Sequence, residues 1–562
     1  MPKVSDYVAD FLAINGIHLA FELSGGMISH LLDSFAAHPD IRVISMHHEQ
    51  SASFAAEAVG RLTGRPAVAL GTSGPGALNL VSGIASCYYD SVPALFITGD
   101  VQTYMEAGQK PLRQFGLQEC PFPAVAAPIA KSAVSVKRAA DVPAAFEQAL
   151  LTAVSGRPGP VVIELPFDVQ GQPLNAQAAA VALPPPQPPA DDAVTVANEI
   201  LASAQRPLIL AGGGVRSPAA SDALRRFAEK TGVPLATSIA ALDVVPAGHP
   251  LRVGLVGMYG TRAGNLVMAE SDAILVVGSR LDAGLIGADT SAWERHKTIV
   301  RVDCDAGELS ARLRNAKQFH ADAGAFLAAA LASAPNGVHA EWRARVQQLK
   351  SEHPDTAEHA TGADINPNLF MHQLSAGSGD AVAYVVDAGQ HTWWSAQSLQ
   401  LTGSQRYLGA TGLWAMGSSL PAAIGVALHT GRPVVAIAGD AGIQLNLQEL
   451  HALIRYQLPV KIVVINNHCH GMVRQFQDEF FDRRRPSTVW GYSPPDFTAV
   501  AAAYGIRSAA VDRQDDVPAA VARMWADPAA PFLLNATIPL DINVSPYVPL
   551  GRPLSGMVPP RP

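Results

Sequence analysis

Clustered cysteines, long apolar runs and an excess of positive charge are all missing from this sequence. The chain has four cysteines, which lie far apart and form no CxxC or Cys/His cluster: Cys87, Cys120, Cys304 and Cys469. This spacing argues against a structural zinc site and a disulfide framework, and it favours a reducing compartment. No stretch of about 18 apolar residues that could cross a membrane occurs, and the N-terminus is typical of an amphipathic helix rather than a signal peptide. We therefore expect a soluble cytoplasmic protein with no membrane partner.

Positive charge is outweighed by negative charge. The chain has 40 Lys and Arg against 48 Asp and Glu, a formal charge of -8, and a pI of about 6.1. The two signs are mixed along the chain, so the sequence lacks the basic surface that attracts polyanions. Nucleic acid is therefore disfavoured as a partner.

The apolar content is high enough for several cores. The 562 residues are 48% hydrophobic and 16% charged, which argues against extended disorder. At roughly 100–200 residues per domain, this length indicates three or four domains. A single small binding module is excluded.

Short runs rich in Val, Ile and Leu recur, each followed by Gly, Pro, Asp or Ser. They include PAVALGTSG, PALFITGD, PVVIELP, PLILAGGG, AILVVGS, AVAYVVDAG, PVVAIAGD and KIVVINN. Runs of four to seven residues without alternation are typical of parallel strands covered on both faces. Ala-rich helical stretches alternate with them, which predicts an α/β fold of three doubly wound parallel-sheet domains.

Two breaks divide the chain. ALPPPQPPADD (182–192) is too proline-rich for a helix or a central strand, and ASAPNGVH (332–339) precedes a charged helical stretch. The predicted domains are therefore 1–182, 190–335 and 345–545, followed by a tail over 546–562. The tail is either disordered or a lid over a site, because its Tyr, Val, Leu and Met give it apolar surface to bury.

Asp440 and Asn467 each end one of two successive predicted strands, PVVAIAGD and KIVVINN, with the helix-patterned LNLQELHALIRY between them. Parallel strands end at the same sheet edge, where α/β folds bind ligands. One carboxylate and one amide oxygen there suit Mg²⁺, which completes its shell with water and ligand phosphates. Either dipeptide alone is a common turn pair, so the spacing carries the prediction.

This pattern resembles the thiamine diphosphate motif, GDG followed some 25 to 30 residues later by NN. Ala441 at the third position and GMVRQFQDEFF (471–481) resemble the acetohydroxyacid (acetolactate) synthase family. The resemblance implies a Mg²⁺ site made by Asp440, Asn467 and the backbone carbonyl of Cys469. It also implies that the neighbouring residues contact the cofactor: Gly439, Ala441, Gly442, His470, Gly471 and Met472.

Residues 47–100 resemble the family's pyrimidine-binding domain, and Glu49 falls on its catalytic glutamate. A carboxyl held against a pyrimidine nitrogen can share a proton with it; the alternative is a solvated acid at a helix start. In the family, the glycine-rich turn GTSGPGALN (71–79) lies near the cofactor of the partner subunit. The cofactor-binding residues expected in this domain are Ser24, Gly25, Pro75 and Asn79, and Gln118 is a candidate donor to the developing alkoxide.

Two further stretches resemble family motifs. DAGQHTWW (387–394) resembles DVGQHQMW, which places Gln390 and His391 near the diphosphate, and GLWAMGSSLPAAIG (412–425) resembles GLGTMGFGLPAAIG, which places Met416 under the bend of the cofactor. Met416 as ordinary core filler is the alternative. Because Glu49 and Asp440 come from different subunits in this family, the resemblance implies a homodimer or a homotetramer.

The middle domain resembles the family's flavin-binding domain over 254–282 and 299–309. The residues expected to bind a structural, non-redox FAD are Arg157, Gly213, Gly214, Met258, Gly278 and Arg280. The GxGxxG pattern is incomplete, and a domain that keeps the fold without the flavin is the alternative.

The chain departs from the family at positions that face the substrate. RFDDR becomes Arg280-Leu281-Asp282-Ala283-Gly284, LPKD becomes Leu165-Pro166-Phe167-Asp168, and the Trp of MVRQWQ becomes Phe476. Two cations are lost, although a 2-oxo acid carboxylate needs a countercharge on approach. The acceptor is therefore either pyruvate or a different carbonyl compound.

The resemblance as a whole implies an acetolactate synthase-like carboligase that takes a 2-oxo acid and a ketone or aldehyde acceptor. Two alternatives stay open: a related decarboxylase, lyase or ligase with another substrate, and a non-catalytic paralogue. The need for a separate regulatory subunit is also left open.

Overall fold

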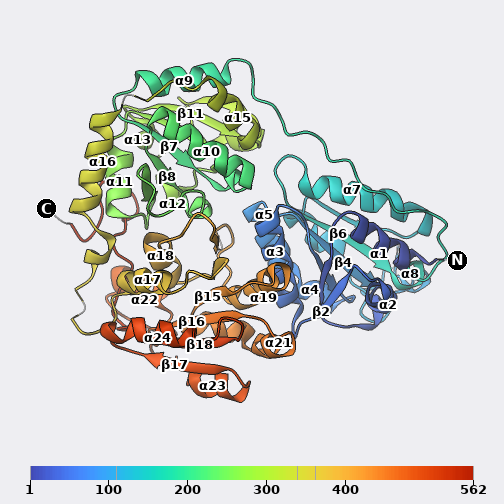
Figure 1. The fold of residues 1–562 in the computed structure, drawn as a ribbon. Helices are drawn as coiled ribbons and strands as arrows, with labels where there is room; N and C mark the ends of the chain where they lie inside the picture. The colour runs from blue at the N-terminus through green and yellow to red at the C-terminus, as the bar shows by residue number, and fades with distance from the viewer. Residues whose placement is uncertain (1, 109–110, 338, 361, 410, 561–562) are drawn as a thin grey trace.

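A computed structural model describes residues 2–108, 111–337, 339–360, 362–409 and 411–560. Within them, the chain forms three sheets of six strands each. Every pair of neighbouring strands within a sheet runs parallel. The predicted class, three parallel-sheet α/β domains, is confirmed (Figure 1).

The N-terminal sheet has the strand order β2-β1-β3-β4-β6-β5. Its strands are β1 (Leu19–Glu22), β2 (Arg42–Ser45), β3 (Val68–Gly71), β4 (Ala94–Asp100), β5 (Ser132–Ser135) and β6 (Pro160–Pro166). Its α-helices are α1 (Val4–Ile14), α2 (Ser29–Ala37), α3 (Glu49–Thr63), α4 (Pro75–Asn79), α5 (Val81–Asp90), α6 (Phe122–Ala126), α7 (Val142–Val154) and α8 (Phe167–Gln170).

The middle sheet has the order β12-β11-β10-β7-β8-β9. Its strands are β7 (Pro207–Ala211), β8 (Leu235–Thr237), β9 (Arg252–Leu255), β10 (Ala273–Val277), β11 (Thr298–Asp303) and β12 (Lys317–His320). The α-helices around it are α9 (Ala193–Ser203), α10 (Pro218–Thr231), α11 (Arg262–Glu270), α12 (Ala283–Ile286), α13 (Thr290–Glu294), α14 (Ala306–Arg312), α15 (Ala323–Ser333) and α16 (Ala340–Glu352).

The C-terminal sheet has the order β14-β13-β15-β16-β18-β17. Its strands are β13 (Ala383–Val386), β14 (Arg406–Gly409), β15 (Val434–Gly439), β16 (Val460–Asn466), β17 (Arg507–Val511) and β18 (Phe532–Thr537). Its helices are α17 (Pro367–Ala376), α18 (Gln390–Ser398), α19 (Ser419–Thr430), α20 (Asp440–Ile443), the 3₁₀ helix η8 (Gln444–Glu449), α21 (Leu450–Arg455), α22 (Gly471–Phe480), α23 (Phe497–Ala503) and α24 (Val517–Met524).

The N-terminal and C-terminal domains share one hydrophobic core. Ala55 of α3 and Ala423 of α19 belong to the same buried cluster. The two helices approach so closely that a Cβ atom on Gly425 would lie 2.3 Å from the Ala55 carbonyl oxygen. A glycine is needed there for backbone approach, and the contact fixes the helix that begins at Glu49 against the C-terminal domain.

A linker and the C-terminal tail lie outside the three sheets. The segment between α8 and α9 crosses from the N-terminal to the middle domain without regular structure over most of its length (Figure 1). The tail lies on the middle domain, because the Val548 amide donates to the Met258 carbonyl at 2.8 Å.

The domain boundary at 345 stays a prediction. It falls inside α16, whose Trp342 indole donates to the Pro207 carbonyl at 2.9 Å. In the described part of the chain, no helix has both the length and the apolar character needed to cross a membrane.

Candidate active site

The carboxyl ends of β15 and β16 open into a cleft of about 340 Å³, which we call the cofactor cleft. Gly439 pairs with Ile465 in the sheet register, so Asp440 and Asn467 emerge from neighbouring strand ends. Both are buried, with 2% and 5% of their surface exposed. The cleft is lined by all the predicted site residues of the C-terminal domain: Gln390, His391, Met416, Gly439, Asp440, Ala441, Gly442, Asn467, Cys469, His470, Gly471 and Met472.

The donor set at the strand ends fits a hard divalent cation. Asp440 offers a carboxylate, Asn467 an amide and Cys469 a main-chain carbonyl, and all three residues line the cofactor cleft. The described residues hold no group of three or more His, Cys, Asp or Glu that could bind a metal. Mg²⁺ does not need such a group, because it usually takes one or two carboxylates and fills its shell with water and phosphate oxygens.

Two helices begin at the cofactor cleft. The first residues of α18 and α22, Gln390 and Gly471, both line it, and the free amides of helix N-termini attract anions such as a diphosphate. Gln390 also holds the two helices together, because its Nε2 donates to Gln475 Oε1 of α22 at 3.0 Å. Its Oε1 accepts from Asn467 Nδ2 at 2.9 Å. A Cβ atom on Gly471 would lie 2.1 Å from that same Oε1, so a larger residue there would displace the Gln390 side chain.

Tyr492 holds the Asp440 carboxylate, and the sequence analysis missed it. Its hydroxyl donates to Asp440 Oδ2 at 3.1 Å and accepts from Gln444 Nε2 at 3.3 Å, while its ring meets that of His470 at 4.7 Å. Burial raises the pKa of Asp440 to about 6, against the opposing effect of the Tyr492 hydrogen bond. A bound cation would favour the charged form of this carboxyl.

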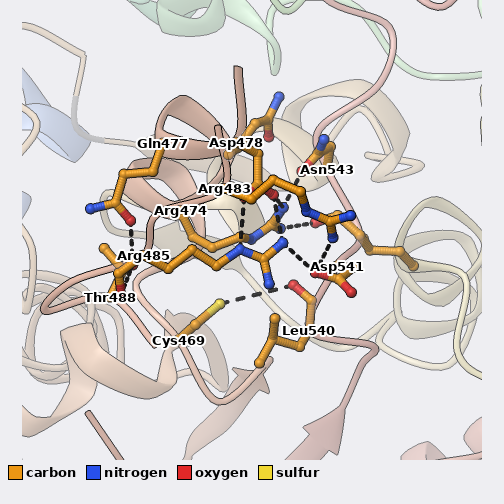
Figure 2. A network of polar contacts seen from close by, with 12 residues as sticks. Cys469, Arg474, Gln477, Asp478, Arg483, Arg485, Thr488, Leu540, Asp541 and Asn543 are labelled. Carbon is orange, nitrogen blue, oxygen red and sulfur yellow. Dashed lines mark hydrogen bonds and ion pairs between the residues drawn. The ribbon is translucent and has the colours of Figure 1, made fainter. Parts of the chain in front are cut away.

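A cluster of ion pairs, which we call the Arg474 clamp, fixes α22 to the loop that follows it and to the segment after β18 (Figure 2). The guanidinium groups of Arg474 and Arg485 both contact Asp478, with Nη1–Oδ2 and Nε–Oδ1 distances of 3.1 and 2.7 Å. Arg485 also binds Asp541 at 2.6 Å, and Arg474 donates to Asn543. The clamp therefore ties the helix whose N-terminus lines the cofactor cleft to the segment that follows β18.

Asp478→Ala is expected to lower the free energy of unfolding by about 2 kcal/mol, because it removes a partner from a buried charge. The Arg474 side chain is 0% exposed and Asp478 17%, so solvent screens this contact only in part. Thermal melts of the purified protein measure the loss. Asp482→Ala is the matched control, because its ion pair with Arg484 lies at the surface, with 89% and 62% of the side chains exposed. Equal shifts in the two variants would refute a stabilising role for the clamp.

Glu49 is the first residue of α3 and is buried, with 5% of its surface exposed. Its Oε2 accepts from Asn79 Nδ2 at 3.0 Å, and a Cβ atom on Gly76 would lie 3.1 Å from its Oε1. The glycine-rich turn therefore lies directly against this carboxyl. Burial raises the pKa of the neighbouring Glu22 carboxyl, and the charge of Glu49 adds to the rise. The structure thus places Glu49 in a buried pocket rather than in solvent.

The other predicted residues of this domain surround the same turn. Pro75 opens α4, exposed Ser24 precedes Gly25, and a Cβ atom on Gly25 would lie 2.3 Å from Thr72 Cβ. Gln118 has a φ of 66°, and its carbonyl would lie 2.8 Å from a Cβ on Gly74. Its exposed side chain belongs to the loop at the glycine-rich turn.

Glu49 is not among the residues that line the cofactor cleft. Within one described chain, the two halves of the predicted site therefore do not form one cavity. Apolar side chains are exposed near both halves: Leu112, Phe115 and Leu117 in the loop of Gln118, and Val473, Phe476 and Phe480 on α22.

A second cavity of about 760 Å³, the middle-domain cavity, lies where the three domains meet. It is lined by all six residues predicted to bind FAD: Arg157, Gly213, Gly214, Met258, Gly278 and Arg280. Two glycines also have a packing role, because a Cβ on Gly214 would lie 2.8 Å from Gly278 Cα. Arg216, which the sequence analysis missed, lines the cavity too; burial lowers its pKa to about 10.

Three aromatic residues that the sequence analysis also missed line both cavities: Tyr259, Trp393 and Trp414. Their rings form a stack, with centroid distances of 4.6 Å for Tyr259–Trp393 and 4.8 Å for Trp393–Trp414. A signal was present in the sequence, because QHTWW and GLWAMG carry tryptophans where the similar motifs have Met and Gly. We call this stack the aromatic wall.

Comparisons with known proteins cover all three domains. Three family models of thiamine pyrophosphate enzymes match this chain. The model of the N-terminal TPP binding domain matches residues 2–120, that of the central domain 194–330, and that of the C-terminal TPP binding domain 387–536. The chain is 34% identical to the acetolactate synthase large subunit of Parasynechococcus marenigrum, over 98% of this chain and 90% of that protein. It is 33% identical to the acetolactate synthase isozyme 2 large subunit of Escherichia coli, over 99% of both chains. It is also 33% identical to the chloroplastic acetolactate synthase 1 of Nicotiana tabacum, over 98% of this chain and 84% of that protein.

Proposed function

The chain belongs to the thiamine pyrophosphate enzyme family, and on that premise we propose that it is an acetolactate synthase-like carboligase. In this reaction one pyruvate loses its carboxyl group as CO₂, and its acyl carbon forms a bond with the carbonyl carbon of a second pyruvate. The carbonyl oxygen of the acceptor takes up a proton, and the product is acetolactate. Atoms and electrons balance without an oxidant.

The observation that carries the proposal is the pairing of Asp440 and Asn467 at neighbouring strand ends in a cleft where α18 and α22 begin. The oxygen donors suit Mg²⁺ and the helix N-termini suit a diphosphate. Thiamine diphosphate, held there, supplies the carbon nucleophile and the electron sink that decarboxylation needs.

The chain's own residues would then orient the cofactor and handle protons. Met416, which lines the cofactor cleft, would support the cofactor, and Glu49 would hold a proton at a ring nitrogen. Gln118 donates a hydrogen bond to the acceptor oxygen as charge develops on it. The hydrogen bond from Asn79 Nδ2 would keep the Glu49 carboxyl in one orientation.

We propose a homodimer or homotetramer in which the second copy completes each site. Glu49 is absent from the lining of the cofactor cleft, and exposed apolar side chains lie near both halves. A site shared across a two-fold axis joins the Glu49 of one copy to the Asp440 of the other. We also propose a separate regulatory subunit as a partner, because relatives of this chain are named as large subunits.

FAD in the middle-domain cavity is part of the proposal, in a structural role. Four arginines line that cavity, Arg61, Arg157, Arg216 and Arg280, and guanidinium groups suit the phosphates of a dinucleotide. Asp303 ends β11 at the same cavity, and a carboxylate there can accept hydrogen bonds from the hydroxyls of a ribose. A cytoplasmic location is supported by the four cysteines, none of which forms a disulfide.

A related lyase or ligase with another acceptor is the second candidate. Phe167, where the family motif has lysine, packs against His30 with ring centroids 4.7 Å apart, and Gly284 stands where the motif has arginine. A carboxylated acceptor therefore has fewer cations to pair with.

The test is product analysis with the purified full-length chain, thiamine diphosphate, Mg²⁺ and pyruvate. We expect CO₂ and acetolactate, identified by mass spectrometry, and a visible flavin spectrum after purification in the presence of FAD. CO₂ with a different coupling product would favour the second candidate. No release of CO₂ from any 2-oxo acid in a broad screen would refute both.

A further inference from the structure

The four arginines that line the middle-domain cavity all contact one short segment at the end of α5. We call it the 89–91 segment; it consists of Tyr89, Asp90 and Ser91, which line the same cavity. Each arginine donates to a different acceptor of the segment: Arg61 to Asp90 Oδ2 at 2.5 Å, Arg157 to Ser91 Oγ at 2.8 Å, Arg216 to the Asp90 carbonyl at 3.2 Å, and Arg280 to the Tyr89 carbonyl at 3.1 Å. A ligand that binds these guanidinium groups therefore also acts on the 89–91 segment.

Asp90 connects the 89–91 segment to the C-terminal domain. Its side chain is 0% exposed, and its two carboxylate oxygens accept from the hydroxyl and the backbone amide of Thr411 at 2.8 and 3.1 Å. Burial acts to raise the pKa of Asp90, but the charge of Arg61 and the hydrogen bonds from Thr411 hold this pKa below its ordinary value. A Cβ atom on Gly412 would lie 2.6 Å from Asp90 Oδ1. The chain at Thr411 is therefore packed closely against a charged, buried carboxylate.

The residues that follow Thr411 lead from the middle-domain cavity to the cofactor cleft. Trp414 lines both cavities, and Met416 lines the cofactor cleft. Trp414 has a φ of 58°, in the left-handed region that a bulky side chain rarely adopts. Such strain persists only where the surroundings enforce it, and the hydrogen bonds from Thr411 to Asp90 are one such restraint. A ligand that stabilises the 89–91 segment therefore also helps to hold Met416 in place.

The charges around the 89–91 segment indicate the direction of this effect. Burial and the positive charge of Arg61 both lower the pKa of Arg216, so these two guanidinium groups repel each other. The phosphates of a dinucleotide bring negative charge to the same cavity and offset this repulsion. We therefore expect a bound dinucleotide to stabilise the arrangement of Asp90 and Thr411 rather than to disrupt it.

We propose that the 89–91 segment couples two cofactor sites, so that FAD in the middle-domain cavity and thiamine diphosphate in the cofactor cleft each tighten the binding of the other. Asp90 is the positioning residue in this coupling, because it contacts both an arginine of the cavity and the segment that leads to Met416. The inference rests on the proposed function, which supplies both cofactors. All of these contacts lie within one polypeptide, so the coupling operates inside each copy of the proposed dimer.

The test is a pair of titrations that gives a coupling factor. The binding of thiamine diphosphate to the full-length chain at saturating Mg²⁺ is measured by calorimetry, without FAD and at saturating FAD. The ratio of the two dissociation constants is the coupling factor, and we expect about 10 in the wild type. Titration of FAD, followed by flavin fluorescence with and without thiamine diphosphate, must give the same factor, because coupling between two binding sites is reciprocal.

Variants of Thr411 and Asp90 test the contacts themselves. Thr411→Val keeps the shape of the side chain and removes the hydroxyl that donates to Asp90 Oδ1, so we expect the coupling factor to fall to about 3 or less. Thr411→Ser keeps the hydroxyl and is expected to retain the factor of the wild type. Asp90→Asn removes the charge that pairs with Arg61 and is expected to abolish the coupling.

Thr402→Val is the matched control. Thr402 is exposed, its hydroxyl contacts that of Ser404 at 3.2 Å, and it is not among the residues that line either cavity. We expect this variant to keep the coupling factor of the wild type. Because the factor is a ratio of two affinities of the same variant, a general loss of stability that weakens both affinities leaves it unchanged.

The outcomes separate this inference from the proposed function. Cofactors that bind the wild type independently, or no binding of FAD to the wild type, would overturn the inference. An unchanged coupling factor in Thr411→Val or in Asp90→Asn, or an equal fall in Thr402→Val, would overturn it too. Acetolactate formation without coupling would leave the proposed function standing alone. Coupling that falls in Thr411→Val, in a chain that releases CO₂ from no 2-oxo acid, would refute the proposed function and support the inference.

Discussion

Glu49→Gln is expected to lower the rate of CO₂ release from pyruvate by about 1000-fold. The amide keeps the size of the side chain and can still pair with Asn79, whose Nδ2 lies 3.0 Å from the carboxylate. It cannot hold a proton and release it at a ring nitrogen of the cofactor. The expected loss is therefore in kcat, while the affinity for thiamine diphosphate changes little. Steady-state assays at saturating Mg²⁺, with cofactor titrations beside them, measure both quantities.

Glu22→Gln is the matched control for this variant. Glu22 is a second buried carboxyl in the same domain, it accepts from the Ser45 hydroxyl at 2.5 Å, and its pKa is raised by burial and by Glu49. Because Glu22 has no proposed role in proton transfer at the cofactor, its replacement is expected to lower kcat by less than about 10-fold. If the two variants lost activity equally, the catalytic assignment of Glu49 would fail and general damage to the pocket would explain the result.

The sequence was sufficient to place the strand ends that form the cofactor cleft. PVVAIAGD and KIVVINN are apolar on both faces, and they become the neighbouring strands β15 and β16, buried on both sides. Once two strands are parallel neighbours, the residues after them must meet at one edge. The juxtaposition of Asp440 and Asn467 is therefore a consequence of local pattern and simple topology.

The stretch between these strands shows where local pattern fails. LNLQELHALIRY has helical periodicity, but the structure has the 3₁₀ helix η8 followed by α21, with non-helical angles at Asn446 (φ -134°, ψ 31°). The Asn446 side chain donates to the Gly417 carbonyl at 2.9 Å and accepts from Ser51 at 2.8 Å. Contacts with two distant segments override helix propensity there, and no periodicity in the stretch itself could reveal them.

Tyr492 escaped prediction for a related reason. It lies 52 residues after Asp440, in a segment with no regular element and no resemblance to a known motif. Its position depends on how the chain folds back after α22, which the ion pairs of the Arg474 clamp help to determine. Long-range contacts of this kind leave no local pattern, whereas the tryptophans of the aromatic wall were visible as departures from a motif.

Asp440→Asn is expected to weaken the Mg²⁺-dependent binding of thiamine diphosphate by about 100-fold or more. The substitution keeps the side chain's size in a site that is 2% exposed, so the main change is the loss of the negative charge that faces the cation. Calorimetric titration of Mg²⁺ at a fixed cofactor concentration measures the loss. Tyr492→Phe removes only the hydroxyl that lies 3.1 Å from Oδ2, and a loss of about 10-fold is expected. Asp496→Asn, at the N-cap of α23, is the matched control and should bind the cofactor normally.

Mixing two inactive variants tests whether Asp440 and Glu49 meet across a subunit interface. In a dimer of one Glu49→Gln chain and one Asp440→Asn chain, one site carries both substitutions and the other carries neither. Random exchange of equal amounts of the two variants is therefore expected to restore about a quarter of the wild-type activity. A site built within one chain could not recover, because every copy would still carry a substitution. Activity that stays at the level of the separate variants, after mass spectrometry has shown that mixed dimers form, would mean that the two halves of the site belong to the same polypeptide.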